Sequence, residues 1–343
     1  MKVSVVILNW NGRKFLQKFL PSIIKYSSYP WSEIIVADNG SVDNSREVVE
    51  KEFPSVKYLQ LDRNYGFAEG YNRAFSQIES DYYLLLNSDV EVTENWLIPL
   101  IECMESDVSV GACHPKILQL DHPEKFEYAG AAGGFIDSFG YPFCRGRIID
   151  IQEDDKGQYD HSIPVFWASG AAILVRSSVW RKMEGFDRDF YAHMEEIDLC
   201  WRMKNQGYKI MVCSSSRVYH LGGGSLAYGN PRKIYLNFRN NLFLLYKNLP
   251  EGKLYTILFS RMILDGIAAL QFLLTGQFSA FRKVFEAHLS FYKNKSSLKS
   301  KRRELLLKVT AVNHPEIYKG SIVWDFFIRG RKKFSDLNFR TES

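Results

Sequence analysis

The chain has 343 residues, of which 46% are hydrophobic and 24% are charged, and its formal net charge is +5. This length and apolar content suit one large domain, or one domain with an appendage, around a substantial buried core. So mild a positive excess does not by itself imply a nucleic-acid partner.

The cysteines are odd in number and scattered, and they include no C-x-x-C pair that would indicate a zinc or redox site: Cys103, Cys113, Cys144, Cys200 and Cys213. This pattern is typical of reduced core residues in a cytosolic protein. The chain opens directly into an apolar run at 3–8 without the basic start and cleavage site of a signal peptide. We therefore expect a cytoplasmic protein.

Four strand-and-helix repeats are predicted in the first 95 residues. Short apolar runs at 3–8, 33–37, 56–61 and 82–86 predict buried strands, and helical spacing of apolar residues follows them. Near-continuous apolar strands that alternate with helices predict a largely parallel sheet covered on both faces.

Each predicted strand is followed at once by polar residues, in the segments 9–12, 38–43, 64–72 and 87–89. In parallel sheets, ligands bind outside the carboxyl ends of the strands, so we expect the functional site at this edge. Ordinary turn chemistry is the alternative explanation for any single cluster.

Neither G-x-G-x-x-G nor G-x-x-x-x-G-K-[ST] follows the first strand, which argues against a dinucleotide oxidoreductase and a P-loop NTPase. The absence of a glycine-rich basic loop also weakens the case for a sugar nucleotidyltransferase. Asp89 follows a strand beside Ser88 and could hold a hard divalent cation, with a diphosphate supplying further oxygen ligands.

Three carboxylates are crowded together at Glu195, Glu196 and Asp198, among apolar neighbours. Crowding and an apolar setting both raise the pKa of a carboxyl group, so one of the three could act as a general base. The alternative is an ordinary acidic first turn of a helix.

Taken together, the segments 3–12, 36–43, 64–67, 85–89, 195–202 and 218–220 resemble the family 2 glycosyltransferases of the GT-A fold, and most closely their rhamnosyltransferase-like branch. The resemblance covers roughly the first two-thirds of the chain. It implies an α/β fold with a mostly parallel central sheet flanked by helices. The expected catalytic domain is 1–228, with a nucleotide-binding half at 1–95 and an acceptor half at 96–228, and a helical extension follows at 229–343.

The resemblance also implies which residues contact the nucleotide-sugar donor. Asp38 would hydrogen-bond the pyrimidine base, and the other expected donor contacts after the first and third strands are Asn9, Asn11, Asn64, Gly66 and Asn72.

The segment Asn87-Ser88-Asp89 occupies the place of the family's D-x-D motif, whose last aspartate binds the metal held by the donor diphosphate. Asn87 replaces the first aspartate, so Asp89 is the expected metal ligand, while Asn87 and Ser88 support donor binding. His220 matches a histidine that completes the metal site in several relatives. Imidazole suits manganese better than magnesium, so the expected cofactor is Mn²⁺ or Mg²⁺.

Glu196 falls where the family places the second residue of its acidic pair and is the expected base of an inverting transfer. Glu195 would orient or tune it, and Asp198 would fix the loop or the helix start.

The family's acceptor segment makes Trp167, Ser169 and Gly170 candidates for acceptor binding, with a core tryptophan beside a tight glycine as the alternative. The glycine run in 221–225 would let that segment close over the donor.

A long apolar segment at 254–278 is interrupted by Arg261 and Asp265, which share one helical face. The expected apolar face is formed by Leu258, Ile263, Ile267, Leu270 and Leu274. This pattern predicts an amphipathic helix on a membrane, and basic clusters at 293–303 and 329–333 would favour an anionic leaflet. The alternative is a helical pair packed on the catalytic domain with a solvated basic face.

These features predict a metal-dependent inverting glycosyltransferase that is peripheral on the inner face of the plasma membrane. It would move a sugar from dTDP-rhamnose or a UDP-sugar to a glycan or polyprenyl-linked acceptor in cell-surface polysaccharide synthesis, and no nucleic-acid partner is expected. A sugar nucleotidyltransferase is one alternative. The other is a non-catalytic sugar-nucleotide-binding or scaffold protein, which Asn87 keeps open.

Overall fold

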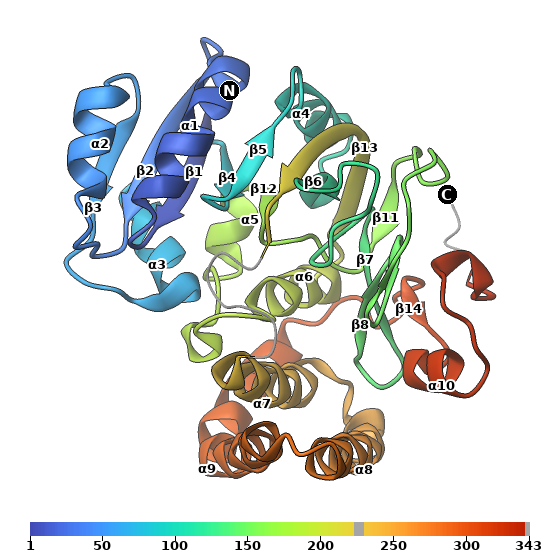
Figure 1. Ribbon diagram of the computed structural model, residues 1–343. Coiled ribbons are helices and arrows are strands. Elements are labelled where there is room, and N and C mark those ends of the chain that lie inside the picture. The colour runs from blue at the N-terminus through green and yellow to red at the C-terminus, as the bar shows by residue number, and fades with distance from the viewer. Residues whose placement is uncertain (223–229, 340–343) are drawn as a thin grey trace.

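The computed structural model describes residues 1–222 and 230–339, and its centre is a nine-stranded sheet with the order β11-β13-β6-β12-β4-β1-β2-β3, with β5 paired to β13 (Figure 1). These strands are β1 Val3–Asn9, β2 Ser32–Asp38, β3 Lys57–Gln60, β4 Tyr82–Leu86, β5 Val90–Val92, β6 Val110–Gln119, β11 Ile163–Val165, β12 Ala172–Arg176 and β13 Lys209–His220. Strands β1 to β4, β6 and β13 run in one direction, and β5, β11 and β12 run in the other. The predicted α/β fold with a mostly parallel sheet is confirmed.

Helices cover both faces of this sheet, as the apolar strands predict. Val5 and Ile7 belong to one core with α1 (Arg13–Ser27), α2 (Ser45–Glu52) and α4 (Leu97–Ser106). Val6, which points the other way, belongs to a second core with α3 (Gly66–Phe75), α5 (Ser177–Lys182) and α6 (Glu195–Asn205). A strand buried on both faces needs apolar side chains at every position, which explains the continuous runs.

A second, smaller sheet lies beside the central one, with the order β10-β9-β8-β7-β14. Its strands are β7 Gly134–Asp137, β8 Pro142–Cys144, β9 Arg147–Ile148, β10 Ile151–Gln152 and β14 Ile317–Tyr318. The last strand comes from the C-terminal part of the chain and pairs with β7 in parallel, followed by α10 (Ile322–Phe327) and a short 3-10 helix (Phe334–Asp336). The C-terminal segment therefore helps to build the second sheet.

Three long helices, α7 (Pro231–Asn248), α8 (Glu251–Leu274) and α9 (Phe278–Leu307), form the expected C-terminal helical region (Figure 1). Helix α7 packs on α6 and lies between the sheets and the outer pair α8 and α9. The proposed division of the chain at residue 228 falls outside the described residues and stays a prediction.

The charged pair of α8 points toward the protein. Arg261 Nε donates to Asp265 Oδ1 over 2.8 Å, both side chains are buried, and the guanidinium lies over the ring of Tyr141. Leu258, expected on the apolar outer face, is also buried, because the inner face of α8 needs apolar side chains to pack on its neighbours. That assignment was therefore wrong.

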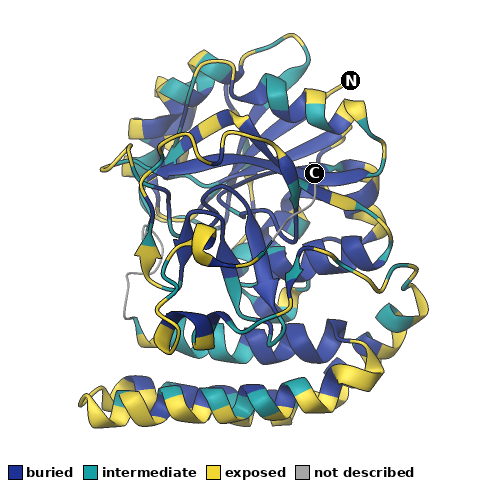
Figure 2. Ribbon diagram, turned by 90° about the vertical axis from the view of Figure 1, so that its right-hand side faces the viewer, coloured by how far each residue is buried: buried dark blue, intermediate teal, exposed yellow. Residues whose placement is uncertain are grey.

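The opposite faces of α8 and α9 are apolar and exposed, and Figure 2 shows their exposed positions on the side turned away from the sheets. The exposed side chains form stripes at helical spacing: Tyr255, Phe259, Ile263, Ile267, Leu270 and Leu274 on α8, and Phe278, Phe281, Phe285, Leu289 and Tyr292 on α9. We call these side chains the outer apolar face. By length and composition alone, α8 could also cross a membrane, with a mean hydropathy of 1.7.

The cysteines are all free thiols, as predicted, but three of them are not scattered in space. The Sγ atoms of Cys103, Cys113 and Cys213, from α4, β6 and β13, all lie within 4.8 Å of one another. The sequence could not show this contact, because the three cysteines are far apart in the chain and only the order of the strands brings them together.

Candidate active site

Strand register gathers the predicted polar residues at one edge of the central sheet. In the parallel pairing of β1 with its neighbours, Asn9 lies beside Asp38, and Ile7 lies beside Leu86. Asn87 follows Leu86 directly, so the segment 87–89 leaves the sheet at the same edge. The expected strand-end site is therefore assembled by the fold.

Asp38 is fully buried at this edge and accepts hydrogen bonds from three neighbouring segments. Its carboxylate accepts hydrogen bonds from Asn9 Nδ2 at 2.9 Å, from the backbone N–H of Ser41 at 2.8 Å and from Gln60 Nε2 at 3.1 Å. The exposed Asn11 closes the neighbouring loop, because its Oδ1 accepts the N–H of Val42 at 2.8 Å. The nucleotide contacts of these residues stay predictions.

Asn64 and Gly66 are linked to β2 through Asn39. The amide of Asn39 donates to Asn64 Oδ1 at 3.2 Å and to the carbonyl oxygen of Gly66 at 3.0 Å. Gly66 has a φ of 78°, and a Cβ atom there would lie 2.6 Å from the ring of Tyr191. Only glycine fits this close approach between the loop after β3 and the loop before α6.

Asn87, Asp89 and His220 come together with a carboxylate that the sequence motifs did not indicate, Glu127. His220 Nε2 lies 3.1 Å from Asp89 Oδ1 and 3.5 Å from Asn87 Nδ2, and His220 Nδ1 lies 3.4 Å from Glu127 Oε1. Ser88 faces Gly12, where an added Cβ would lie 3.7 Å from the serine hydroxyl oxygen.

This cluster fits a divalent cation by the chemistry of its donors. A carboxylate oxygen of Asp89 and the Nε2 atom of His220 face each other and are ligands that suit Mn²⁺. Glu127 faces the other ring nitrogen, Nδ1, where it can orient the imidazole. Among the described residues, His220 Nδ1 is buried and makes no hydrogen bond. Burial on its own would lower the pKa of His220, but the nearby charge of Glu127 and the contact with Asp89 raise this pKa to about 10.

Glu195 and Glu196 begin α6, as the acidic stretch predicts. Burial raises the pKa of Glu196 to about 7, although backbone hydrogen bonds at the helix start lower it. Burial and the charge of Glu196 raise the pKa of Glu195 well above its usual range. One oxygen of each carboxylate, Oε2, is buried without a hydrogen-bond partner among the described residues. Such a carboxyl group is suited to exchange a proton near neutral pH.

The segment 170–171, just before β12, lies between Glu196 and the segment 87–89 that contains Asp89. The backbone N–H of Asn87 donates to the carbonyl oxygen of Ala171 at 2.9 Å. A Cβ atom on the preceding Gly170 would lie 3.8 Å from Cβ of Glu196. The segment 170–171 thus lies between Glu196 and Asn87.

Asp198 is not available for chemistry, because its carboxylate is fully engaged inside the protein. It accepts hydrogen bonds from Arg202 and Lys247, each at 2.8 Å, and from Asn248 at 2.9 Å. Burial on its own would raise the pKa of Asp198, but the charges of Lys247 and Arg202 hold it below the usual range. These contacts agree with the expectation that Asp198 fixes the helix start.

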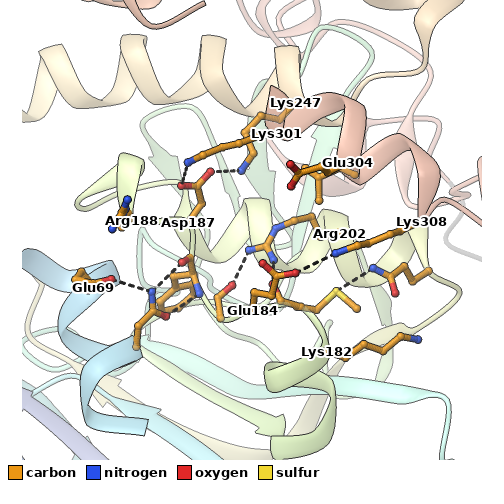
Figure 3. Close-up of a pocket in the computed structure, with 16 residues that line it drawn as sticks. Glu69, Lys182, Glu184, Asp187, Arg188, Arg202, Lys247, Lys301, Glu304 and Lys308 are labelled. Atoms are coloured by element: carbon orange, nitrogen blue, oxygen red, sulfur yellow. Dashed lines mark hydrogen bonds and ion pairs between the residues drawn. The ribbon is translucent and has the colours of Figure 1, made fainter. Parts of the chain in front are cut away.

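A cavity of about 350 Å³ lies on the far side of this ion network (Figure 3). Asp187 projects into it between Lys247 and Lys301, at 2.6 and 2.5 Å. Because these cations are already paired with carboxylates, the cavity is a charged seam between α9 and the loop before α6.

Trp167, Ser169 and Asn72 have structural partners. Trp167 is buried in the core and donates its indole N–H to the carbonyl oxygen of Phe135 at 2.9 Å, and Ser169 is buried and donates to the carbonyl oxygen of Ala129. Asn72 exchanges two 2.9 Å hydrogen bonds with the backbone of Phe186. Their acceptor and donor roles stay predictions, and of the glycine run, residues 223–225 lie outside the described residues.

Two residues of the site escaped the sequence analysis. Glu127 precedes a glycine-rich loop that carries no motif, and only the fold brings it to His220. Asn39 stands within the polar segment after β2, where it could have been recognised as a bridge between loops.

Comparisons with known proteins agree with this geometry. The family model of glycosyl transferase family 2 matches residues 4–171. N-acetylglucosaminyl-diphospho-decaprenol L-rhamnosyltransferase of Mycobacterium tuberculosis is 25% identical over 232 residues, which cover 64% of this chain and 75% of that protein. Rhamnosyltransferase WbbL of Escherichia coli is 23% identical over 226 residues, which cover 64% and 83%.

Solved structures show the same fold. GalNAc-T7 with UDP, GalNAc and Mn²⁺ superposes with a TM-score of 0.56 at 17% identity, over 72% of this chain and 48% of that one, so the match spans about half of that protein. S. aureus TarS 1-349 in complex with UDP-GlcNAc gives a TM-score of 0.55 at 16% identity, over 89% and 92%. The chain therefore belongs to the family 2 glycosyltransferases of the GT-A fold and is rhamnosyltransferase-like within that family.

Proposed function

We propose that this glycosyltransferase is metal-dependent and inverting, with Glu196 as its general base. The observation that carries the proposal is the placement of Gly170 and Ala171 between Glu196 and the cluster of Asn87, Asp89 and His220. An acceptor hydroxyl at this point would have a base on one side and the group that holds the diphosphate on the other.

In an inverting transfer the acceptor oxygen forms a bond to the anomeric carbon while the bond from that carbon to the diphosphate oxygen breaks. Glu196 would take the hydroxyl proton, and the nucleoside diphosphate would leave with the electron pair. A pKa of about 7 suits this role, because the group is then partly ionised at neutral pH and still basic enough to accept the proton.

Asp89 and His220 would hold the divalent cation, with Glu127 beside them, and a bound cation neutralises the charge that develops on the leaving diphosphate. Mn²⁺ is the preferred candidate because of the imidazole ligand, and GalNAc-T7 was solved with Mn²⁺. Glu127 does not replace the aspartate lost at Asn87, because it faces Nδ1 of His220 while Asn87 and Asp89 face Nε2; it would instead orient the imidazole.

The expected donors are dTDP-rhamnose, because the relatives include rhamnosyltransferases, and UDP-sugars, because TarS binds UDP-GlcNAc. The mycobacterial relative acts on a decaprenol-linked sugar, so we propose a polyprenyl-linked glycan as the acceptor class and cell-surface polysaccharide synthesis as the process.

A lipid-linked acceptor is consistent with the outer apolar face. We propose that this face rests on the cytoplasmic surface of the plasma membrane, in the plane of the interface. The buried pair of Arg261 and Asp265 opposes a spanning arrangement, because a crossing helix would have to leave its partners on the protein. Lys295, Lys299 and Arg303 are exposed on α9 beyond the apolar stripe and would attract anionic lipids.

The activity is tested by screening nucleotide sugars with Mn²⁺ or Mg²⁺ and measuring release of nucleoside diphosphate. The Glu196→Gln variant should bind donor and lose turnover, whereas Asp89→Asn should lose metal-dependent donor binding. Consumption of a nucleoside triphosphate with release of inorganic diphosphate would instead establish a nucleotidyltransferase.

The membrane contact is tested by sedimentation with vesicles. The wild type should bind anionic vesicles more than neutral ones, and Phe259→Asp combined with Phe285→Asp should reduce binding. Val108→Asp is the matched control, because Val108 is apolar and 82% exposed but lies outside the outer apolar face. The proposal would be contradicted if the wild-type protein did not sediment with vesicles and instead formed dimers through the outer apolar face.

A further inference from the structure

The loop that leads into the proposed base has a backbone conformation that is unfavourable for its residues. Tyr191, His193 and Met194 have φ values of 64°, 68° and 72°, a region that side-chain-bearing residues seldom adopt. Tyr191 is the centre of a tight γ-turn, in which the N–H of Ala192 donates to the carbonyl oxygen of Phe190 at 2.8 Å. Strained loops of this kind persist only when their surroundings hold them.

The restraint on this loop comes from the C-terminal helix α7. Asn240 is fully buried, and its side-chain amide donates to the carbonyl oxygens of Phe190, Ala192 and His193 at 2.9, 2.8 and 2.7 Å. The remaining carbonyl of this run, that of Tyr191, accepts the N–H groups of Phe67 and Ala68 at the start of α3. Every carbonyl from 190 to 193 is therefore engaged.

Arg239 completes the restraint from the same helix. Its Nη2 donates to the carbonyl oxygens of Asp189 and Phe190 at 2.9 and 3.0 Å, and its Nε donates to Asn240 Oδ1 at 2.8 Å. The last bond fixes the orientation of the amide, so that its two N–H groups point at the loop.

We infer that Asn240 is a positioning residue for the transfer reaction, which holds the loop 190–194 so that Glu196 lies in its working position at the start of α6. The inference rests on the proposed role of Glu196. An amide is required because it supplies two N–H donors, whereas a carboxylate of the same shape would oppose carbonyl oxygens.

Asn241 offers a matched control on the same helix. It is equally buried, and its amide donates to the carbonyl oxygen of Gly140 at 2.8 Å, in the turn between β7 and β8 and away from the catalytic loop. Asn240→Ala and Asn241→Ala each remove hydrogen bonds to backbone carbonyl oxygens from inside the protein, so both should lower Tm. Only the first should disturb Glu196.

The experiment compares kcat, donor KM and amide hydrogen exchange of the full-length variants. Asn240→Ala should lower kcat about 10- to 100-fold while donor KM changes less than about twofold, because small displacements of a catalytic group cost rate and not ground-state binding. Asn241→Ala should keep wild-type kcat. Arg239→Gln, on a partly exposed residue, should reproduce the kcat loss in weaker form if Asn240→Ala folds poorly.

Exchange of the amide protons in peptides that cover 190–198 should accelerate in the Asn240 and Arg239 variants and stay unchanged in Asn241→Ala. This measurement needs no substrate, so it tests the restraint even if the wild type transfers no sugar and the proposed function fails. Equal loss of kcat in Asn240→Ala and Asn241→Ala would overturn the inference, as would unchanged exchange of the loop in Asn240→Ala.

Discussion

Replacing Glu196 by glutamine should make the folded protein more stable at alkaline pH while it stops turnover. The pKa of Glu196 is raised from 4.5 to about 7, so the folded protein binds this proton more tightly than the unfolded chain does. Stability is therefore lost as the pH rises from 4.5 to about 7, and the loss is complete above that range. One pKa unit corresponds to about 1.4 kcal/mol, so ionised Glu196 costs about 3 kcal/mol.

The assay is a pair of thermal or urea melts of wild type and Glu196→Gln at several pH values, alongside kcat. The difference in stability should be close to zero near pH 4.5 and grow to about 3 kcal/mol at pH 8, a rise in Tm of about 3–6 °C. Over the same range kcat should be lower by about 10²- to 10⁴-fold. Glu102→Gln, on an exposed carboxylate of α4, should change neither quantity.

Two results would refute this reasoning. A stability difference that does not depend on pH would mean that burial does not oppose ionisation of Glu196. If the Glu196→Gln variant kept the wild-type kcat, Glu196 would not be the general base, whatever its pKa. A stabilised but inactive variant would show that the protein retains a buried carboxylate for function at the expense of stability.

Three further predictions follow from single contacts. His220→Ala should weaken metal-dependent donor binding at least about tenfold, and an unchanged metal titration would leave His220 with a structural role. Asn72→Ala should lower the free energy of unfolding by about 1–3 kcal/mol, because both backbone groups of Phe186 lose a hydrogen-bond partner. The donor Kd should stay unchanged, and weaker donor binding would instead support the predicted donor role of Asn72. Asp265→Ala should cost about 3–5 kcal/mol in urea melts by leaving Arg261 buried and unpaired, and adding Arg261→Leu should recover part of it.

The central sheet could be predicted from the sequence because local chemistry determines it. Strands buried on both faces must be apolar throughout, so the polar segments after them, which contain Asp38 and Asp89, could be placed at one edge of the sheet from their positions in the sequence. Their individual roles came from the family resemblance and stay predictions. The regular alternation of strands and helices leaves few arrangements for such segments.

The remaining parts of the site could not be predicted, because they depend on contacts between distant segments. Glu127, in the segment between β6 and β7, meets His220 at the end of β13, and Asn240 meets a loop 47 residues earlier in the chain. The helical pattern of α8 identified Arg261 and Asp265 on one face, but it could not show that this face is the buried one. A buried ion pair and an exposed apolar stripe reverse the usual amphipathic arrangement.

This reversal indicates what the C-terminal helices contribute. Their polar groups point inward: Asn240 holds the catalytic loop, Lys247 holds Asp198, and Lys301 holds Asp187. The inner faces also carry apolar side chains, but on α8 and α9 a second apolar stripe points outward and forms the outer apolar face. A helix that only covered the catalytic domain would be expected to expose polar side chains in place of this stripe. Under the proposed function, helices that reach the loop before Glu196 on one side and present an apolar surface on the other would serve a transferase with a lipid-linked acceptor in two ways: they would fix the base, and they would fix its distance from the membrane.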